Sequence, residues 1–270
     1  MNNADRMGDP CRSMQAFSHQ PVTVRDKRAV IVGGTSGIGE AIALGFAADG
    51  ANVIASSRRR AAVERTAGRL EHLGASTARV AVDVTDQSSI TELRDEAMDA
   101  LGGIDIIVTS QGAISREAVL EISDAEWSRV LDVQLNGVKR VIQTLAPSID
   151  GHGAIVVISS LAARLAMANL PAYAAAKGGV EALTRAAAKE LAPAIRVNAI
   201  APGFVITPQN EEVYAEGTEK RQRIDSRCPL GRVAERDEIV GAAIYLASDA
   251  ASYTTAEVMT VDGGFAPSAL

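Results

Sequence analysis

This chain of 270 residues contains few aromatic residues, cysteines and histidines, and it carries no excess of positive charge. Aromatic side chains make up 3% of the residues, and there are two cysteines and three histidines. The formal net charge is −6 at pH 7, so the basic footprint of a nucleic-acid-binding protein is missing and no nucleic acid partner is expected. No apolar run approaches the length of a membrane span, so no membrane partner is expected either.

The few cysteines and histidines indicate neither a disulfide nor a metal site. Cys11 and Cys228 are far apart in sequence, and free thiols in a reducing cytoplasm are the expected state. His19, His72 and His152 are expected at the surface, and no cluster has the spacing of metal ligands, so no metal is expected. The first 26 residues are polar and lack the apolar stretch of a secretory signal. They predict a flexible N-terminal extension, residues 1–26, on a cytoplasmic protein.

Apolar runs bounded by turns alternate with longer segments of helical period from residue 28 onward, and 47% of the residues are hydrophobic. Wholly apolar strands alternating with helices are typical of a parallel sheet buried on both faces. We therefore predict a single α/β domain over residues 27–270, a doubly wound Rossmann-type parallel sheet of about seven strands with helices on both faces. The expected strands are Arg28–Val32, Asn52–Ser56, Thr77–Val82, Ile104–Val108, Ala154–Ile158, Ile195–Ile200 and Val258–Val261. The expected helices are 37–49, 60–73, 88–101, 124–146, 173–191 and 235–246.

The stretch from Phe204 to Arg227 breaks this rhythm because it is polar and contains no clear strand. Long insertions of this kind at the carboxyl edge of a sheet are usually lids or substrate loops. We expect residues 204–227 to cover a substrate site.

A glycine-rich turn, residues 33–39, follows the first strand and opens the first helix. Glycines there let the backbone turn tightly and approach a pyrophosphate, which the positive helix N-terminus favours. The required context of strand, turn and helix is met, so the turn predicts a dinucleotide site.

The end of the second strand predicts which dinucleotide binds. An acidic residue there would bind the ribose hydroxyls of NAD, but Ser57 takes that place and Arg58 follows it. Arginine makes charge-assisted pairs with phosphate, and cations at a helix start are otherwise unfavourable. NADP is therefore favoured over NAD.

Tyr173 and Lys177 stand one helical turn apart on the same face of an expected helix. A nearby cation favours the phenolate over the phenol, so the lysine should lower the pKa of the tyrosine and make it a usable acid or base. Glu181, Lys189 and Glu190 on the same helix are expected on its solvated face.

Taken in order, these motifs resemble the short-chain dehydrogenase/reductase family over nearly the whole chain from about Lys27. The glycine turn matches, with Val32 where threonine is usual, and Asp262-Gly263-Gly264 matches the closing motif. Ser160, thirteen residues before Tyr173, matches the catalytic serine. The resemblance implies that Asp83 and Val84 contact adenine, and that the 202–207 segment holds the nicotinamide carboxamide. The implied cofactor-binding residues are Gly33, Thr35, Ser36, Gly37, Ile38, Gly39, Ser57, Arg58, Asp83, Val84, Gln111, Gly112, Tyr173, Lys177, Pro202, Gly203, Val205 and Thr207.

The resemblance implies hydride transfer between a nicotinamide and the carbon of a secondary alcohol or ketone. Ser160 would hydrogen-bond the substrate oxygen, Tyr173 would pass the proton, and Lys177 would also hold the nicotinamide ribose. A homotetramer built on helices 124–146 and 171–191 is also implied.

Two departures from the family pattern stand out. The segment after the fourth strand reads Thr109-Ser110-Gln111-Gly112 in place of the family's Asn-Asn-Ala-Gly. Gln134 stands where the family has a fourth catalytic residue, an asparagine that helps hold a water next to the lysine. Gln134 is thus a candidate catalytic residue, and an inactive cofactor-binding regulator is an open alternative.

The substrate class also has alternatives. The Gln111-Gly112 turn, the 202–204 segment and the ending 261–268 are similar to the gluconate 5-dehydrogenase branch, which implies a keto sugar acid such as 5-ketogluconate. The alternative is a 3-oxoacyl-thioester reductase acting on an acyl carrier. The expected lid carries four cations that suit either anionic substrate, Lys220, Arg221, Arg223 and Arg227.

Overall fold

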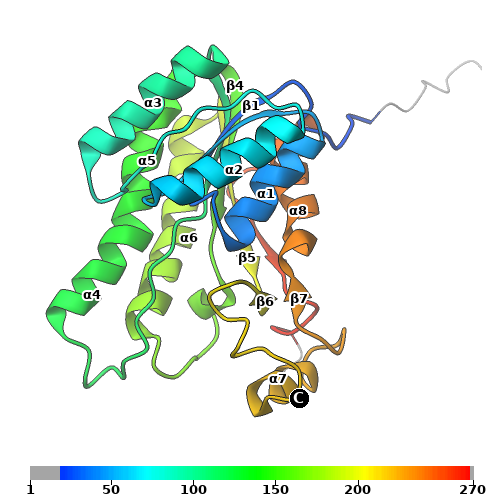
Figure 1. Ribbon diagram of the computed structural model, residues 1–270. Helices are drawn as coiled ribbons and strands as arrows, with labels where there is room; N and C mark the ends of the chain where they lie inside the picture. The colour runs from blue at the N-terminus through cyan, green and yellow to red at the C-terminus, as the bar shows by residue number, and fades with distance from the viewer. Residues whose placement is uncertain (1–18, 268–270) are drawn as a thin grey trace, which may run out of the picture.

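A six-stranded parallel sheet forms the centre of the molecule in the computed structural model, which describes residues 19–267. The strand order is β2-β1-β3-β4-β5-β8, which confirms the predicted doubly wound α/β class (Figure 1). The strands of this sheet are β1 (Arg28–Val32), β2 (Asn52–Ser56), β3 (Ile104–Thr109), β4 (Ile149–Ile158), β5 (Ile195–Pro202) and β8 (Val258–Val261). A separate pair is formed by β6 (Val205–Ile206) and β7 (Ala234–Glu235). The α-helices are α1 (Gly37–Ala48), α2 (Arg60–His72), α3 (Gln87–Leu101), α4 (Asp124–Leu131), α5 (Gly137–Leu145), α6 (Pro171–Leu191), α7 (Glu219–Asp225) and α8 (Val240–Ala247).

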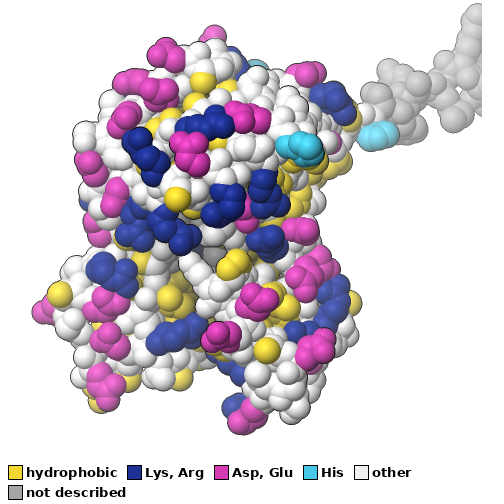
Figure 2. All heavy atoms as spheres, in the orientation of Figure 1, with side chains coloured by type: hydrophobic (Ala, Val, Ile, Leu, Met, Phe, Trp, Pro, Cys, Tyr) yellow, Lys and Arg dark blue, Asp and Glu magenta, His cyan; other side chains and the backbone are white. Residues whose placement is uncertain are grey.

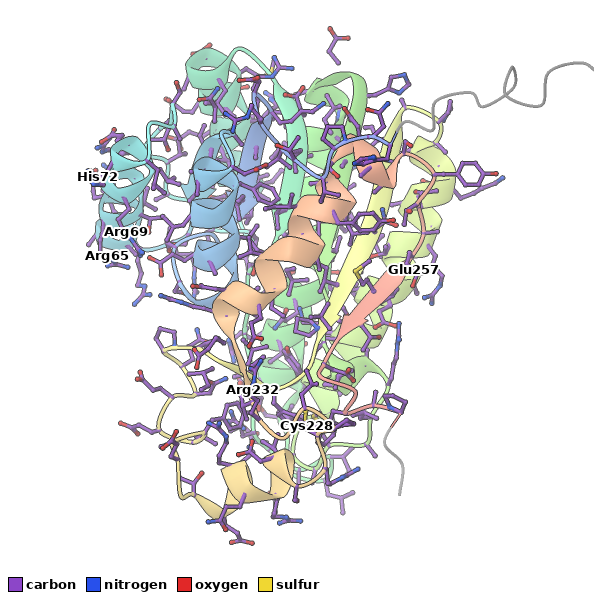
Figure 3. All side chains as sticks on the ribbon, turned by 90° about the vertical axis from the view of Figure 1, so that its right-hand side faces the viewer. Arg65, Arg69, His72, Cys228, Arg232 and Glu257 are labelled. Atoms are coloured by element: carbon purple, nitrogen blue, oxygen red, sulfur yellow. The ribbon has the colours of Figure 1, made fainter. Side chains whose placement is uncertain are left out.

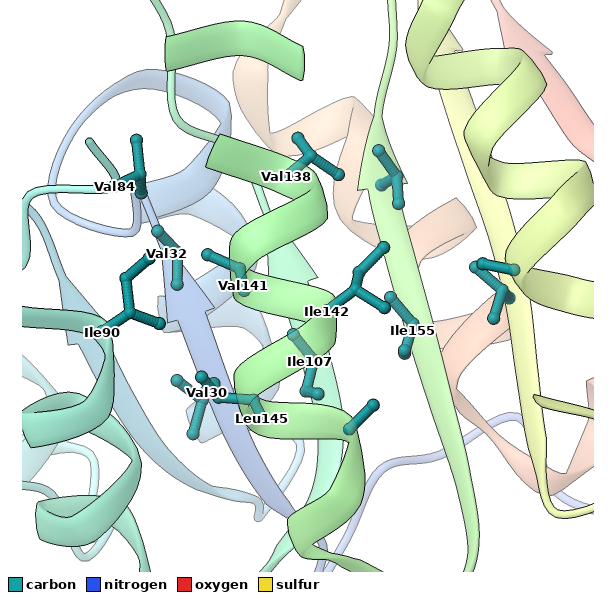
Figure 4. Packing of buried hydrophobic residues seen from close by; sticks show 14 of the residues in the cluster. Val30, Val32, Val84, Ile90, Ile107, Val138, Val141, Ile142, Leu145 and Ile155 are labelled. Atoms are coloured by element: carbon teal, nitrogen blue, oxygen red, sulfur yellow. The ribbon is translucent and has the colours of Figure 1, made fainter. Parts of the chain in front are cut away.

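Helices cover both faces of the sheet. Alternate residues of each strand point to opposite sides, and both sets are apolar, so both faces need a covering layer. Val30 and Ile107 face the layer of α3, α5 and α6, whereas Ile31 and Val108 face α1, α2 and α8. Figure 4 shows the first of these layers, where α5 lies across β1, β3 and β4. Its labelled side chains are Val30, Val32, Val84, Ile90, Ile107, Val138, Val141, Ile142, Leu145 and Ile155.

The predicted strand Thr77–Val82 was wrong. Among the described residues, its only bridge to the sheet is a single parallel pairing of Ala81 with Ser57. The Ser56 hydroxyl of β2 donates to the carbonyl oxygen of Val80. In a regular ladder a backbone amide of β2 would be the donor. The segment therefore runs beside β2 without forming a ladder, and the main sheet has six strands, not seven.

The predicted helix 124–146 is interrupted by a π-helical turn, Asp132–Asn136, between α4 and α5. Single π-turns inside α-helices occur often at functional sites. The residue at the middle of this turn is Gln134.

The N-terminal extension is anchored earlier in the chain than expected. Residues 1–18, and Cys11 with them, lie outside the described residues. The carboxylate of Asp49 accepts hydrogen bonds from the Thr23 hydroxyl at 2.7 Å and from the Val24 amide at 2.6 Å, and Val24 is fully buried. Residues before Lys27 are thus packed against the domain.

The segment 204–227 stands apart from the main sheet and contains β6 and α7. Its underside packs around Leu161, Ile224, Cys228, Val233 and Phe265. Figure 3 shows Cys228 and Arg232 in this lower part of the molecule, close to α7. Since Leu161 directly follows Ser160, this packing brings the segment against the candidate site.

Candidate active site

The carboxyl end of β4 and the first turns of α6 bring together Ser160, Tyr173 and Lys177. Proline at the first position of α6 suits a helix start. Lys177 is buried, with its Nζ 5.7 Å from the centre of the Tyr173 ring. The Ile158 carbonyl oxygen accepts a hydrogen bond from this Nζ at 2.6 Å.

Ser160 follows β4 in an extended conformation, and its Oγ accepts a hydrogen bond from the Ala162 amide at 3.1 Å. Its side chain is also a hydrogen-bond partner of Tyr173, which favours the phenolate. The three residues that the sequence singled out therefore share one site.

The electrostatics of the free protein differ from the sequence-based prediction. Burial raises the pKa of Tyr173, and the hydrogen bond with Ser160 offsets this only in part. Burial also lowers the pKa of Lys177 to about 8. The predicted lowering of the Tyr173 pKa is therefore not seen, because burial is the largest influence on this phenol and raises its pKa.

Gln134 lies inside the molecule and faces the loop after β3. Its Nε2 donates to the Ala113 carbonyl oxygen at 2.8 Å, whereas its Oε1 has no hydrogen-bond partner within the described residues. A buried amide oxygen without a partner is rare and indicates a position that a water or ligand satisfies. Both polar atoms of the Gln111 side chain are also buried without a partner in this part of the chain.

The glycine turn between β1 and α1 has the geometry that a dinucleotide site requires. Gly33 has a φ of +80°, and a Cβ there would lie 2.4 Å from the Gln111 amide nitrogen. A Cβ on Gly39 would lie 2.2 Å from the Gly33 carbonyl oxygen, so only glycine lets α1 start against the turn. The Thr207 methyl group lies 3.4 Å from the Cβ position of Gly37, which joins the 202–207 segment to the same edge.

The second strand ends beside this turn with polar and cationic residues. The Thr35 and Ser57 hydroxyls lie 2.6 Å apart. Arg58 is exposed and makes no ion pair or hydrogen bond with any residue that the structure describes. Figure 2, drawn in the orientation of Figure 1, shows Lys and Arg side chains gathered across the middle of the visible surface, below α2. These residues fit the adenosine end of a phosphorylated dinucleotide.

Asp83 is partly buried and already engaged within its own loop. Its Oδ1 accepts hydrogen bonds from the Thr85 amide and hydroxyl at 2.9 and 2.7 Å. Its neighbour Val84 is buried against Gly137 at the start of α5. The predicted adenine contacts at both positions remain predictions.

Three aromatic rings, those of Phe204, Tyr214 and Phe265, pack together on the lid side of the site. The ring of Phe204 packs edge-on against Tyr214, with centroids 6.0 Å apart, and against Phe265 at 4.8 Å. Tyr214 lies close enough to Tyr173 for its own phenolate charge to raise the pKa of Tyr173.

Three of the four lid cations expected to bind substrate are engaged elsewhere. Arg221 pairs with Asp225 at 2.8 Å, and Arg223 lies 3.8 Å from Glu219. Arg227 lies over the Phe265 ring at 4.9 Å. Each of these arginines thus already faces a partner within the lid or at its base.

Lys220 is the fourth lid cation, and the sequence analysis missed a second cation beside it, Arg116. Lys220 Nζ lies 5.4 Å from the centre of the Tyr214 ring. Burial and the charge of Arg116 both lower the pKa of Lys220, and Arg116 also acts to lower the pKa of Tyr214. Neither cation has an ion pair among the described residues. The position of Arg116, four residues after Gly112, was the only signal in the sequence.

Glu181 was predicted on the solvated face of its helix, and this was wrong. It is 6% exposed, because the face of α6 that carries Tyr173 and Lys177 continues to it one turn later. Lys189 and Glu190 are exposed as predicted.

The histidines and the potential metal ligands of the described residues form no cluster. His19, His72 and His152 are exposed, and residues 19–267 contain no group of three or more potential metal ligands. No helix in that range is both long and apolar enough to cross a membrane.

Comparisons with known proteins agree with this geometry. The family model described as enoyl-(acyl carrier protein) reductase matches residues 32–266. A 3-oxoacyl-[acyl-carrier-protein] reductase of Thermotoga maritima is 37% identical over 88% of this chain and 97% of the relative. A galactitol 2-dehydrogenase (L-tagatose-forming) of Cereibacter sphaeroides is 38% identical over 88% and 94%. A candidate NAD(P)-dependent gluconate 5-dehydrogenase of Beutenbergia cavernae, solved with NADP bound at low occupancy, is 37% identical with a TM-score of 0.85, over 91% of this chain and 98% of that one.

Proposed function

The chain belongs to the short-chain dehydrogenase/reductase family and is an NAD(P)-dependent oxidoreductase acting on CH–OH groups, and we propose that it reduces keto sugar acids such as 5-ketogluconate with NADPH. The observation that carries the substrate class is the pair of cations at the lid, Arg116 and Lys220. A substrate carboxylate there would receive charge-assisted hydrogen bonds from both sides. The ketone of the same molecule would then lie towards Ser160 and Tyr173.

The proposed chemistry assigns one role to each residue. A bound nicotinamide supplies the hydride for the carbonyl carbon. Ser160 donates a hydrogen bond to the substrate oxygen, and Tyr173 delivers the proton to it. Lys177 stabilises the phenolate that Tyr173 becomes when it gives up its proton, and it also binds the nicotinamide ribose. Gln134 donates its Nε2 hydrogen to the Ala113 carbonyl oxygen and offers its Oε1, which has no partner among the described residues, to the water that resupplies the proton.

We propose NADP over NAD because Arg58 is exposed at the end of β2 without a partner among the described residues, and Ser57 stands where a carboxylate would repel a 2′-phosphate. The glycine turn, Asp83 and Val84, Gln111 and Gly112, and the 202–207 segment complete the proposed cofactor site. Two solved relatives, the Beutenbergia cavernae protein among them, contain bound NADP.

A 3-oxoacyl-thioester reductase is the second candidate. The Thermotoga maritima relative carries that name, and the exposed apolar side chain of Val213 in the lid suits an acyl chain. With that substrate, Arg116 and Lys220 would meet the phosphate of a carrier arm instead of a sugar acid.

The remaining parts of the proposal concern organisation. The described residues act as one catalytic domain, with 204–227 as its substrate lid. The protein is a cytoplasmic homotetramer in which α4, α5 and α6 pack against their symmetry mates, since closed two-fold arrangements are the default for soluble homo-oligomers.

The experiment follows NADPH absorbance with a panel of keto sugar acids, 3-oxoacyl thioesters, cyclic ketones and diketones. We expect a keto sugar acid to be the best substrate. Arg116→Ala and Lys220→Ala should each raise KM for it about 10- to 100-fold, the loss typical of a hydrogen bond to a charged group, with KM for a neutral ketone unchanged. Arg223→Ala is the matched control, because this exposed lid arginine already faces Glu219 and should leave KM unaltered.

Three outcomes would contradict the proposal in different ways. Preference for an acyl thioester would favour the second candidate. Equal losses on neutral ketones would remove Arg116 and Lys220 from carboxylate recognition. Absence of turnover on every carbonyl, with NADPH still bound, would favour the cofactor-binding regulator.

A further inference from the structure

Three residues of α6, spaced four apart, face the last residues of β4 and the turn that follows. Tyr173 partners the Ser160 side chain, and Lys177 donates to the Ile158 carbonyl oxygen at 2.6 Å. Between these two contacts in sequence lies Ser159, whose hydroxyl donates to Glu181 Oε1 at 3.1 Å. Successive turns of the helix thus hold three consecutive residues of the chain that carries the candidate catalytic serine.

Glu181 and Ser159 form this contact deep inside the molecule, where they are 6% and 2% exposed. Hydrogen bonds to an ionised group are stronger than neutral ones, and leaving such a group unpaired in the interior is costly. The Ser159 amide also donates to the Ile200 carbonyl oxygen at 2.7 Å, so this residue is fixed from β5 as well as from α6.

The second oxygen of Glu181 holds the far end of the same turn. Its Oε2 accepts a hydrogen bond from Arg164 Nε at 3.2 Å, and Arg164 Nη1 reaches Thr260 Oγ1 on β8 at 3.3 Å. Ser160 lies between the two chain positions that the carboxylate binds. One side chain therefore fixes the turn on both sides of Ser160 relative to α6.

We propose that Glu181 is a positioning residue that sets the distance and orientation of Ser160 against Tyr173. It touches neither substrate nor cofactor, and it acts through Ser159 and Arg164. Catalysis is sensitive to such alignment, because a displacement of about 1 Å in a catalytic group is able to cost about 10²-fold in rate. This inference rests on the proposed roles of Ser160 and Tyr173, and it adds a residue whose function is alignment.

The test measures kcat, KM, NADPH affinity and thermal stability for Glu181→Ala, Glu181→Gln and Ser159→Ala, with the best ketone from the substrate panel. We expect Glu181→Ala to lower kcat about 10- to 100-fold by misalignment, with the NADPH Kd little changed, because the glycine turn and Arg58 are untouched. Glu181→Gln keeps an acceptor for Ser159 and should regain most of kcat. Ser159→Ala should also lower kcat and leave the NADPH Kd unchanged, and it carries the test if Glu181→Ala fails to fold.

A double variant and a stability control separate positioning from general damage. Ser159→Ala combined with Glu181→Ala should lose no more than Glu181→Ala alone, since the contact that Ser159→Ala breaks is already lost in that variant. Asp105→Ala breaks the hydrogen bonds from Arg28 near the amino end of β3, whereas the candidate site lies at the carboxyl ends of the strands. It should lower the melting temperature and leave kcat unchanged.

The inference is overturned if Glu181→Ala and Ser159→Ala keep wild-type kcat, if kcat and NADPH affinity fall together, if Glu181→Gln is as slow as Glu181→Ala, or if the two single losses multiply. Failure of the proposed function itself is distinguishable, because Tyr173→Phe would then retain turnover.

Discussion

The buried ammonium of Lys177 lies 5.7 Å from the centre of the Tyr173 ring and donates a hydrogen bond to the Ile158 carbonyl oxygen at 2.6 Å. Burial raises the pKa of the phenol and lowers the pKa of the ammonium to about 8. Both changes mean that burial disfavours charge on the two groups that the proposed proton transfer uses. Placing a cofactor and substrate there would supply further partners for these groups.

Tyr173→Phe should abolish turnover and leave NADPH binding nearly unchanged. The substitution removes the hydroxyl that passes the proton and keeps the ring between Ser160 and the lid. Activity is followed by NADPH absorbance and binding by fluorescence titration. Near-wild-type turnover by the purified variant would remove Tyr173 from the chemistry.

Lys177→Met should change how stability depends on pH. The folded-state pKa of about 8 lies below the ordinary value of 10.5, so the unfolded chain binds this proton more tightly. The resulting loss of wild-type stability is fully present below pH 8 and disappears as pH rises to 10.5. A tenfold difference in proton affinity corresponds to about 1.4 kcal/mol. Between these two pH values, the unfolding free energy of the wild type should therefore rise by about 3 kcal/mol relative to that of the Met variant.

Urea denaturation at about pH 7, 8, 9 and 10.5 measures this difference. A stability difference that stays constant over these pH values would show that burial does not disfavour the charged form of Lys177. The comparison needs no activity, so it is independent of the proposed reaction.

Arg58→Ala should weaken NADPH binding far more than NADH binding. Loss of a charge-assisted contact with the 2′-phosphate typically costs about 1.5–3 kcal/mol, or about 10- to 100-fold in Kd. Arg60→Ala is a matched control at the first residue of α2, two positions later. A wild-type protein that already prefers NADH in a titration would contradict the assignment of NADP.

The sequence predicted the glycine turn and the Tyr173 and Lys177 pair because each is a local pattern, whereas Ser160 was implied by the family resemblance. The spacing of Tyr173 and Lys177 fixes one helix face, and Gly33 and Gly39 are required by contacts within a single βα unit. The boundaries of β1, α1, β2 and α6 differ from the predictions by at most two residues, whereas β4 begins five residues earlier than predicted.

What the sequence did not predict depends on contacts between distant segments. Burial of Glu181 depends on Ser159 and Arg164, which lie 22 and 17 residues earlier. The 77–82 segment, predicted as a strand, meets β2 through the Ser56 hydroxyl, and the charge of Arg116 acts on Lys220 of the lid, far along the chain. No local pattern encodes which partner a side chain meets across the fold.

The assembly makes a separate prediction. Ala182 and Ala186 of α6 are exposed, and Gly178 has open space where a side chain would lie, so a second helix has room to approach closely. Light scattering at micromolar concentration should give the mass of four chains. Ala182→Arg should dissociate that assembly by placing a charge in the interface, whereas a wild-type monomer would refute it.

Gln134 gives the last prediction, because it departs from the family at a position that touches mechanism. Its amide nitrogen is committed to the Ala113 carbonyl oxygen, and its Oε1 is buried with no partner in the described chain. If that oxygen holds the water next to Lys177, Gln134→Ala should slow turnover about 10²-fold, the size of a general acid–base contribution, with little change in NADPH affinity. Gln134→Asn, which restores the family residue, should be neutral or faster.

Gln143→Ala is the control for these variants, since that amide lies exposed on α5 and should not affect turnover. Wild-type activity in Gln134→Ala would leave Ser160, Tyr173 and Lys177 to carry the chemistry alone. An inert wild type together with an active Gln134→Asn would instead identify a cofactor-binding regulator. We expect the slowed Gln134→Ala, because the π-helical turn that buries Gln134 keeps its amide against the loop after β3, and the residues that need a proton supply are all present.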